Sequence, residues 1–361
     1  MNTPRPLMSL DEALERLVAG ASAAAITATE QVSTFEALGR VLAEDVVSGL
    51  DVPPADNTSM DGYAVRCADL TMPGTVLPVA QRIPAGTVGQ PLQPGTAARI
   101  FTGAQVPPGA DAVVMQEQCV PVDGGAVRID AVPTPGQWIR RRGEDIGTGS
   151  VVLARGARLT PQALGLAAAV GRASLTVRRR PRVALFSTGD ELAMPGEPLK
   201  PGGIYNSNRF TLRGLLQAAG CEVQDLGIVP DRLDATRDAL KRAAAASDLI
   251  VTSGGVSVGE EDHLRPAMLA EGRLDLWQIA MKPGKPLAFG AVRRAAADGE
   301  ALFVGLPGNP VSSWVTCLLA VMPLLRALQG MPQAAPKAVA VRADFDWPRP
   351  DKRREFVRAR L

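Results

Sequence analysis

The second half of the chain alternates strand-like and helix-like patterns, and this alternation limits the possible fold most. Short apolar runs typical of buried strands occur at 183–187, 222–229, 248–253 and 301–306. Helical patterns occur near 208–219, 232–246 and 311–329. Strands that alternate with helices form a parallel sheet covered by helices on both faces. The sequence therefore predicts a multidomain α/β plus β fold with a central doubly wound parallel-sheet domain over residues 182–331.

The first half has a different organisation. Ser9 and Glu12 have the spacing of a capping box, and the apolar residues after them predict a helix over residues 9–19. A second helix is predicted over residues 160–171, and we expect it to pair with the first. Between them, short Val- and Ile-rich runs are interrupted by Pro and Gly, which predicts a β-rich insertion.

These patterns predict four domains. A discontinuous helical linking domain covers residues 1–50 and 146–181, and a β-rich inserted domain covers residues 51–145. The α/β domain covers residues 182–331. Residues 332–361 are expected to form two or three strands, although so short a segment cannot bury much of a core alone.

Charge and composition exclude several classes of function. The 39 basic and 37 acidic residues nearly cancel, so no overall field attracts the chain to nucleic acid or to a membrane surface. We interpret the basic run RRRPR at 178–182 as a solvated linker. The 4 cysteines are far apart and His263 is the 1 histidine, so no zinc-binding pattern is present. We interpret His263 as a surface or capping residue, because the sequence offers no further residues with which it would form a nucleophilic triad.

The chain shows no pattern that predicts secretion or a membrane span. Its first ten residues, MNTPRPLMSL, lack the apolar core of a signal peptide. The most apolar helical stretch, WVTCLLAVMPLL from Trp314, is too short to cross a bilayer and contains Pro323. Dispersed thiols are typical of a reducing compartment. We therefore predict a soluble cytoplasmic protein that binds neither nucleic acid nor a membrane.

Polar loops follow all of the predicted parallel strands. In an open parallel sheet, ligands bind beyond the carboxyl ends of the strands. Turn chemistry explains any one of these loops, whereas several at one edge favour a binding site. The loops are STGDEL (187–192), PDRLD (230–234), TSGGVSVGEED (252–262) and PGNPVS (307–312). The candidate residues in them are Thr188, Gly189, Glu191, Asp231, Ser253, Gly254, Gly255, Ser257, Pro307 and Asn309.

The loop at 252–262 combines an anion-binding pattern with carboxylates. Gly254 and Gly255 can adopt positive φ and bring backbone N–H groups close to an oxygen-rich ligand, and Ser253 and Ser257 add hydroxyl donors. The carboxylates at 260–262 have two interpretations. They cap the helix that begins near residue 262, where the helix dipole favours negative charge. Alternatively, a divalent cation such as Mg²⁺ bridges one of them to a phosphate on the glycines.

A basic loop, KPGKP at 282–286, carries the positive charge that the strand-end loops lack. Pro283 and Pro286 make the loop stiff and keep it out of a helix interior. Lys282 and Lys285 are at most about 10 Å apart along the chain, so they can hold an oxyanion or a pair of phosphates. A solvated loop with incidental lysines is the alternative.

Seven motifs occur in an order and spacing that resemble one enzyme family. They are MDGYAV, FTGA, RRRGEDIG, FSTGDEL, TSGGVSVGEED, KPGKPLAFG and GLPGNPVS. The set is similar to that of the molybdopterin molybdenumtransferase (MoeA) family, which includes the gephyrin E domain, and the resemblance runs from residue 8 to the end of the chain. The resemblance implies insertion of molybdate into adenylylated molybdopterin with release of AMP, assisted by a divalent cation such as Mg²⁺.

The resemblance also implies an assembly. The α/β domain would be a molybdopterin-binding domain similar to MogA, and the protein would be a homodimer whose subunits share their clefts. Molybdopterin adenylyltransferase and molybdoenzymes are the expected protein partners. Family members usually continue beyond residue 361 to complete a small β-barrel, so we expect residues 332–361 to form a partial C-terminal barrel.

Matching positions identify the residues that the family uses. Catalytic or ligand-binding positions correspond to Asp61, Thr102, Asp145, Glu191, Asp231 and Asp262, with Asp262 and Glu191 as the implied metal ligands. The molybdate pocket corresponds to Lys282, Lys285, Pro286 and Ser312, and a further arginine to Arg358 or Arg354. Taken alone, the segments around Asp61, Thr102 and Asp145 are more typical of turns and surface charge clusters.

Two other functions fit parts of the sequence. A molybdopterin adenylyltransferase shares the strand-end loops of residues 183–330, but DNTSMDGYAV and KPGKP argue against that function. A non-catalytic molybdopterin-binding scaffold is the second alternative, suggested by the relationship to gephyrin.

Overall fold

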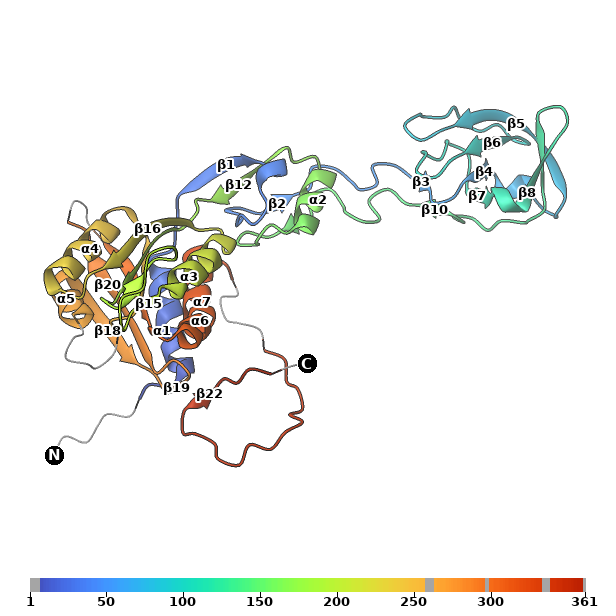
Figure 1. The fold of residues 1–361 in the computed structure, drawn as a ribbon. Coiled ribbons are helices and arrows are strands. Elements are labelled where there is room, and N and C mark those ends of the chain that lie inside the picture. Colours follow the sequence, from blue (N-terminus) through green and yellow to red (C-terminus); the bar gives the residue numbers. More distant parts are fainter. Residues whose placement is uncertain (1–6, 257–262, 296–298, 333–337, 360–361) are drawn as a thin grey trace. The chain divides into compact units, whose positions relative to one another are not determined.

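The computed structural model describes residues 7–256, 263–295, 299–332 and 338–359 (Figure 1). The chain divides into two compact units, each with its own hydrophobic core. The first unit is Met1–Glu44, Arg155–Pro161 and Ser174–Leu361, and the second is Asp45–Ala154 and Gln162–Ala173. The four-domain division expected from the sequence stays a prediction.

The first unit is built on a six-stranded sheet with the strand order β16-β13-β17-β21-β20-β18. The four predicted strands are confirmed and parallel: β13 (Arg182–Thr188), β16 (Glu222–Val229), β17 (Leu249–Ser253) and β21 (Glu300–Leu306). The sheet is mixed, because β20 (Pro286–Arg293) and β18 (Gly272–Gln278) extend it with antiparallel pairing. These two strands follow each other and β21 closely in the chain, and short connections join antiparallel strands.

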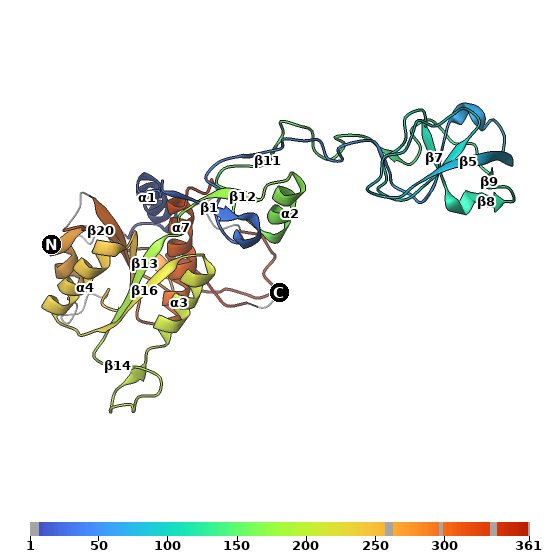
Figure 2. The same cartoon turned by 90° about the horizontal axis from the view of Figure 1, so that it is seen from above.

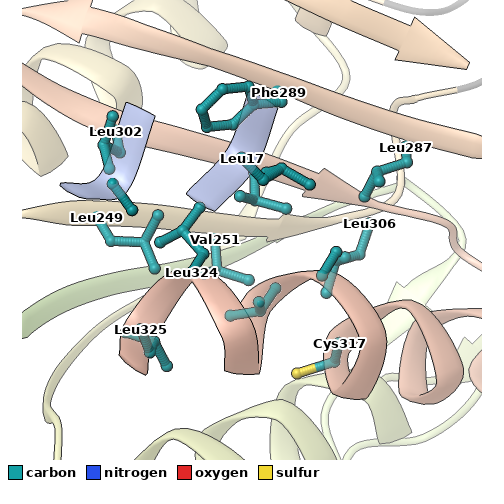
Figure 3. Packing of buried hydrophobic residues seen from close by; sticks show 14 of the residues in the cluster. Leu17, Leu249, Val251, Leu287, Phe289, Leu302, Leu306, Cys317, Leu324 and Leu325 are labelled. Carbon is teal, nitrogen blue, oxygen red and sulfur yellow. The ribbon is translucent and has the colours of Figure 1, made fainter. Parts of the chain in front are cut away.

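Helices cover both faces of this sheet. One face carries α4 (Leu233–Ala246) and α5 (Leu264–Glu271). The other carries α1 (Leu10–Ala23), α3 (Ser207–Ala218) and a long helix made of α6 (Pro310–Thr316), the π-helical turn η4 (Cys317–Val321) and α7 (Met322–Leu328). Figure 3 shows Leu17 of α1 and Leu324 of α7 among the side chains of Leu249 and Val251 of β17. This packing forms the core on which the strand ends rest.

Helix α1 lies in this core, which differs from the expected pairing with residues 160–171. Its start is as predicted, since the Ser9 hydroxyl oxygen accepts a hydrogen bond from the Glu12 backbone N–H at 3.2 Å. Leu10 and Leu17 are buried together with side chains of the sheet and α7. A sheet face offers more apolar area than a second short helix, which explains the difference.

The segment from α6 to α7 is one continuous helix, Pro310–Leu328, long and apolar enough to cross a membrane. The expectation that this stretch is too short to cross a bilayer is therefore wrong. Asn309 caps the helix, so it begins at Pro310 and not at Trp314. Leu324 and Leu325 are nonetheless buried against the sheet, and 56% of the most apolar window is buried. The segment therefore has the packing of a core helix.

The basic run at 178–182 is a structural element and not a solvated linker. Arg179 donates two hydrogen bonds to Asp248, both at 3.0 Å. Arg178 and Arg180 donate to backbone carbonyl oxygens. Carbonyl groups at the edge of a packed region need donors, and guanidinium groups supply several each.

The second unit consists mainly of strands. All the Val- and Ile-rich runs of residues 75–130 contribute strands to one six-stranded sheet, with the order β7-β4-β6-β5-β9-β8. Its strands are β4 (Gly62–Val65), β5 (Thr75–Ile83), β6 (Ala97–Ile100), β7 (Ala112–Met115), β8 (Cys119–Val122) and β9 (Ala126–Ile129). Its shorter elements are β2 (Val46–Val47), β3 (Asn57–Thr58), η2 (Cys67–Asp69), η3 (Gln116–Gln118), β10 (Ile139–Arg140) and β11 (Val151–Leu153). Helix α2 (Pro161–Ala169) lies within the range predicted for it.

The remaining elements are short. They are β1 (Thr29–Ser33), η1 (Thr34–Glu36), β12 (Ser174–Arg178), β14 (Leu192–Ala193), β15 (Ile204–Tyr205), β19 (Met281–Lys282) and β22 (Arg354–Glu355). Within residues 338–359, β22 is the one strand, paired with β19, where two or three strands were expected. Val339, Val341 and Phe345 are exposed there, so little apolar burial supports further strands.

Candidate functional site

A cavity of about 480 Å³ opens at the carboxyl ends of the parallel strands. Its wall consists of the loops after β13, β17 and β21 and of the segment from β15 into α3. Figure 2 shows the loop that carries β14 extending away from the end of β13. Of the predicted residues, the structure brings together Thr188, Glu191, Ser253, Gly254 and Asn309 around this cavity.

Two glycines allow the loop after β17 to pass close to β13. Gly254 has φ +89°, and a Cβ there would lie 2.5 Å from the carbonyl oxygen of Thr188. Gly255 has φ +66°, and its Cβ would lie 2.7 Å from the Thr188 hydroxyl. The Gly254 N–H donates to the Leu306 carbonyl of β21 at 3.1 Å, so this N–H does not point at an anionic ligand. The need for glycine here therefore comes first from close packing.

A network of buried polar side chains forms the floor of the cavity. The hydroxyls of Ser187 and Ser253 lie 3.1 Å apart, and Ser187 also donates to Asn206 Oδ1 at 3.5 Å. Asn206 Oδ1 accepts from the Arg209 N–H at 3.2 Å and so caps α3. These bonds to Asn206 Oδ1 fix the orientation of the side-chain amide, and therefore the direction of its Nδ2 donor. Asn206 Nδ2 is buried without a hydrogen-bond partner, and so is the Thr188 hydroxyl.

Asn206 and Asn208 are site residues that the sequence analysis did not name. Asn208 also lines the cavity, and its Nδ2 donates to the Gly308 carbonyl oxygen at 2.8 Å. The signal was the segment YNSN immediately before the predicted helix at 208–219, since asparagine is a preferred cap. The pattern does not contain the hydrogen bond of Asn208 to Gly308, a residue 100 positions further along the chain.

Carboxylates gather at the ends of β13 and β16. The Asp231 N–H donates to Asp190 Oδ1 at 3.1 Å. Burial raises the pKa of Asp231, the negative charges of Asp190 and Glu191 raise it further, and His263 opposes this effect. The predicted residues Glu191 and Asp231 are therefore electrostatic neighbours. His263, interpreted as a surface or capping residue, occupies the N-cap position of α5, although its side chain makes no capping hydrogen bond.

Asp231→Asn is expected to raise the Tm at neutral pH. An acid whose pKa is higher in the folded than in the unfolded state costs stability when it is ionised. That cost is fully present when the pH lies above the pKa of Asp231 in the folded state. It disappears as the pH falls from that pKa toward the pKa of an unfolded aspartate, about 4. Thermal unfolding of both proteins between pH 4 and 8 should show a Tm difference that shrinks as the pH falls. A difference independent of pH would contradict this account.

The start of α6 connects the cavity to the basic loop at 282–286. Asn309 Oδ1 accepts hydrogen bonds from the Ser312 N–H at 3.0 Å and from the Ser312 hydroxyl at 3.1 Å. A Cβ at Gly284 would lie 2.5 Å from Thr316 Cγ2, so the basic loop packs on the same helix. The lysine loop therefore packs against α6, the helix that Asn309 caps and that carries Ser312, and Pro307 lies just before this helix.

The two lysines of the basic loop differ in their surroundings. Lys282 Nζ lies 2.7 Å from Glu355 and 3.8 Å from Asp351, and the hydrogen bond to Glu355 raises its pKa. Lys285 is exposed, and within the described part of the chain no carboxylate pairs with it. Lys285, rather than Lys282, presents an unpaired positive charge.

The two candidate arginines, Arg354 and Arg358, have different surroundings in the structure. Arg354 donates two hydrogen bonds to Asp11, at 2.7 and 2.9 Å, and so fastens the C-terminal segment to α1. Arg358 lines a second cavity, of about 720 Å³, together with Pro283 and Trp314. Arg358 therefore lies beside the basic loop, whereas Arg354 is engaged in an ion pair.

Predicted residues of the second unit are held by local contacts. Asp61 Oδ1 accepts hydrogen bonds from the backbone N–H of Thr102 at 2.8 Å and from its hydroxyl at 2.7 Å, and these bonds lower the pKa of Asp61. Asp145 forms an ion pair with Arg140. The predicted Asp61 and Thr102 are thus brought together within this unit.

Part of the predicted site lies outside the described residues. Asp262 and Ser257, and the carboxylates at 260 and 261, fall in the range 257–262. Among the residues that are described, no three His, Cys, Asp or Glu side chains are grouped to hold a metal ion. The metal site of Asp262 and Glu191 therefore stays a prediction.

The fold and the strand-end cavity define a class of protein. Residues 184–327 match the family model of a probable molybdopterin binding domain. Residues 8–171 match the model of the MoeA N-terminal region, domains I and II. The chain thus joins a molybdopterin-binding domain to the N-terminal region of one particular family.

Relatives agree over most of the chain. It is 46% identical over 308 residues to the molybdopterin molybdenumtransferase of Haemophilus influenzae, covering 85% of this chain and 74% of the relative. It is 42% identical to molybdopterin molybdenumtransferase 2 of Mycobacterium tuberculosis, covering 91% and 82%. The crystal structure of a molybdopterin biosynthesis moeA protein from Pyrococcus horikoshii matches with a TM-score of 0.76 and 32% identity, over 91% and 81%. The chain belongs to the molybdopterin molybdenumtransferase family, transferases of molybdenum cofactor biosynthesis.

Proposed function

We propose that the chain inserts molybdate into adenylylated molybdopterin and releases AMP. The observation that carries this proposal is the cavity at the strand ends, with Glu191 in its wall and buried hydroxyl and amide groups in its floor. Its volume of about 480 Å³ is in the range of small-molecule sites. Membership of the family supports the choice of substrates.

The proposed molybdate pocket is Lys282, Lys285, Pro286, Ser312 and Arg358. Lys285 and Arg358 supply positive charge for a dianion, and the Asn309 cap holds Ser312. Lys282 is bound to Glu355, so molybdate has to compete with that ion pair. This competition favours Lys285 as the stronger contributor to molybdate affinity.

The reaction breaks the phosphorus–oxygen bond that joins AMP to the pterin phosphate, and an oxygen of molybdate or water becomes bonded to phosphorus. Glu191 and Asp262 would hold a divalent cation such as Mg²⁺, whose charge would offset that of the phosphate. Asp231, whose pKa is raised by burial and by the charges of Asp190 and Glu191, keeps its proposed catalytic role beside Glu191. Asp61, Thr102 and Asp145 keep their proposed catalytic and binding roles.

We further propose that the protein acts as a cytoplasmic homodimer. Its proposed protein partners are the molybdopterin adenylyltransferase that supplies the substrate and the molybdoenzymes that accept the product. Sedimentation of the purified chain tests the dimer directly.

One assay tests the function. The full chain is incubated with adenylylated molybdopterin, molybdate and Mg²⁺, and AMP is measured. Release that depends on molybdate is expected. Consumption of ATP with bare molybdopterin would instead indicate an adenylyltransferase, and tight binding without turnover would indicate a scaffold.

Asn206→Asp is expected to raise the KM for adenylylated molybdopterin about tenfold and to lower the Tm, because the position is buried and the new carboxylate oxygen would have no partner. Aspartate caps a helix as well as asparagine does, but it replaces the Nδ2 donor by a negative charge facing an anionic ligand. Asn206→Ala removes the cap as well, and should cost about 1 kcal/mol of stability. If the KM is unchanged in both variants, Asn206 acts in folding only.

A further inference from the structure

The sheet of the second unit carries two arginines opposite each other on neighbouring strands. Arg82 of β5 is in register with Arg99 of β6, and Arg99 is in register with Tyr63 of β4. The guanidinium carbons of Arg82 and Arg99 lie 4.5 and 4.6 Å from the centroid of the Phe101 ring. Arg99 also lies 5.1 Å from the Tyr63 ring. Two positive charges therefore share one aromatic ring.

In residues 45–154, a span that the structure describes throughout, neither arginine forms an ion pair with a carboxylate, although the charge of Arg99 helps to lower the pKa of Asp61. Arg99 donates to the Gly62 carbonyl at 2.9 Å and to Gln116 Oε1 at 2.7 Å, and both partners are neutral. Like charges directly opposite each other on adjacent strands repel, and a half-buried cation without an anion is costly. A bound anion would offset both costs.

Other arginines of the same unit are neutralised. Arg128 donates to both carboxylate oxygens of Asp130, and Arg140 pairs with Asp145. Arg141 pairs with Asp56 through Asp56 Oδ2. The pair Arg82 and Arg99 is therefore distinct from the charge pattern around it.

We propose that Arg82 and Arg99 form a binding site for a phosphate monoester. A guanidinium fork matches phosphate oxygens, and two forks stacked on one ring present donors from the same face of the sheet. Arg99 is already oriented by Gly62 and Gln116, whereas Arg82 is exposed and contacts only the Phe101 ring among the contacts described for it. Phe101 directly precedes Thr102, so the site adjoins Asp61.

AMP is the probe, and this choice rests on the proposed function, in which AMP is the product. Calorimetric titration of the full chain with AMP, adenosine and inorganic phosphate separates the phosphate from the nucleoside. AMP and inorganic phosphate should bind and adenosine should not. Arg82→Gln should weaken AMP binding about tenfold, the worth of one charge-assisted hydrogen bond.

Arg128→Gln is the matched control, because it removes an exposed positive charge that Asp130 already neutralises. Equal AMP affinity in Arg82→Gln and Arg128→Gln would overturn the proposal, as would adenosine binding as tightly as AMP. Arg99→Gln should weaken AMP binding further, and if it lowers the Tm, Arg82→Gln alone decides. AMP release in the turnover assay is a separate readout. A chain that binds AMP through Arg82 but releases none would refute the proposed function and leave this site standing.

Discussion

Replacing Glu191 with Gln is expected to lower the rate of molybdate-dependent AMP release by at least about 100-fold, with little change in Tm. Glu191 lines the strand-end cavity, and its charge is the part of the side chain that can balance a cation there. The amide has the same shape but no charge. Single-turnover release of AMP at neutral pH, with thermal unfolding of the same preparation, measures both quantities.

The neighbouring glycine explains why Glu191 is placed for this role. A Cβ at Gly189 would lie 2.5 Å from Glu191 Oε2, so the carboxylate folds back over Gly189 and a side chain at this position would displace it. Gly189 has φ +143°, which also favours glycine. In the loop STGDEL, the absence of a side chain at Gly189 therefore leaves space for the carboxylate of Glu191.

Glu197→Gln is the control for this prediction. Glu197 lies on the same excursion after β13, and its carboxylate accepts a hydrogen bond from the Met194 N–H at 2.9 Å, at an exposed position. Its substitution should leave the rate within about twofold, because surface substitutions are usually close to neutral. Similar losses in both variants would trace the effect to the charge of the loop. An unchanged rate in Glu191→Gln would contradict the assignment.

The fold of the first unit was predictable where local patterns decide it. Buried strands and amphipathic helices repeat their apolar residues at fixed periods, so β13, β16, β17 and β21 could be placed from the sequence. Strands β18 and β20 were missed. Their antiparallel pairing depends on short connections and on neighbouring strands, which single-segment patterns do not contain.

The site was predictable as far as the rule on strand ends reaches. That rule places Thr188, Glu191, Ser253 and Asn309 at one edge, and they line one cavity. Long-range pairing was not predictable: Lys282 binds Glu355 and Arg354 binds Asp11, partners distant in the chain. The arginines at 178–182 are a similar case, because their partners are carbonyls and a carboxylate that only the folded chain brings near.

Gly254→Ala is expected to destabilise the first unit by about 2–4 kcal/mol and to lower its Tm by about 5–10 °C. Two costs add here. An alanine at φ +89° is strained, and its Cβ would overlap the Thr188 carbonyl oxygen at 2.5 Å, a backbone atom that cannot move without shifting β13. Because Thr188 lines the cavity, the same shift should weaken substrate binding.

Gly196→Ala separates the two costs. Gly196 has φ +96°, but a Cβ there meets nothing within 4 Å, so its substitution carries the backbone strain without the overlap. It should cost about 1 kcal/mol. Calorimetric unfolding of both variants gives the overlap as their difference. If the two variants lose the same stability, the close approach of the loop to β13 contributes nothing, and Gly254 is required for its backbone conformation alone.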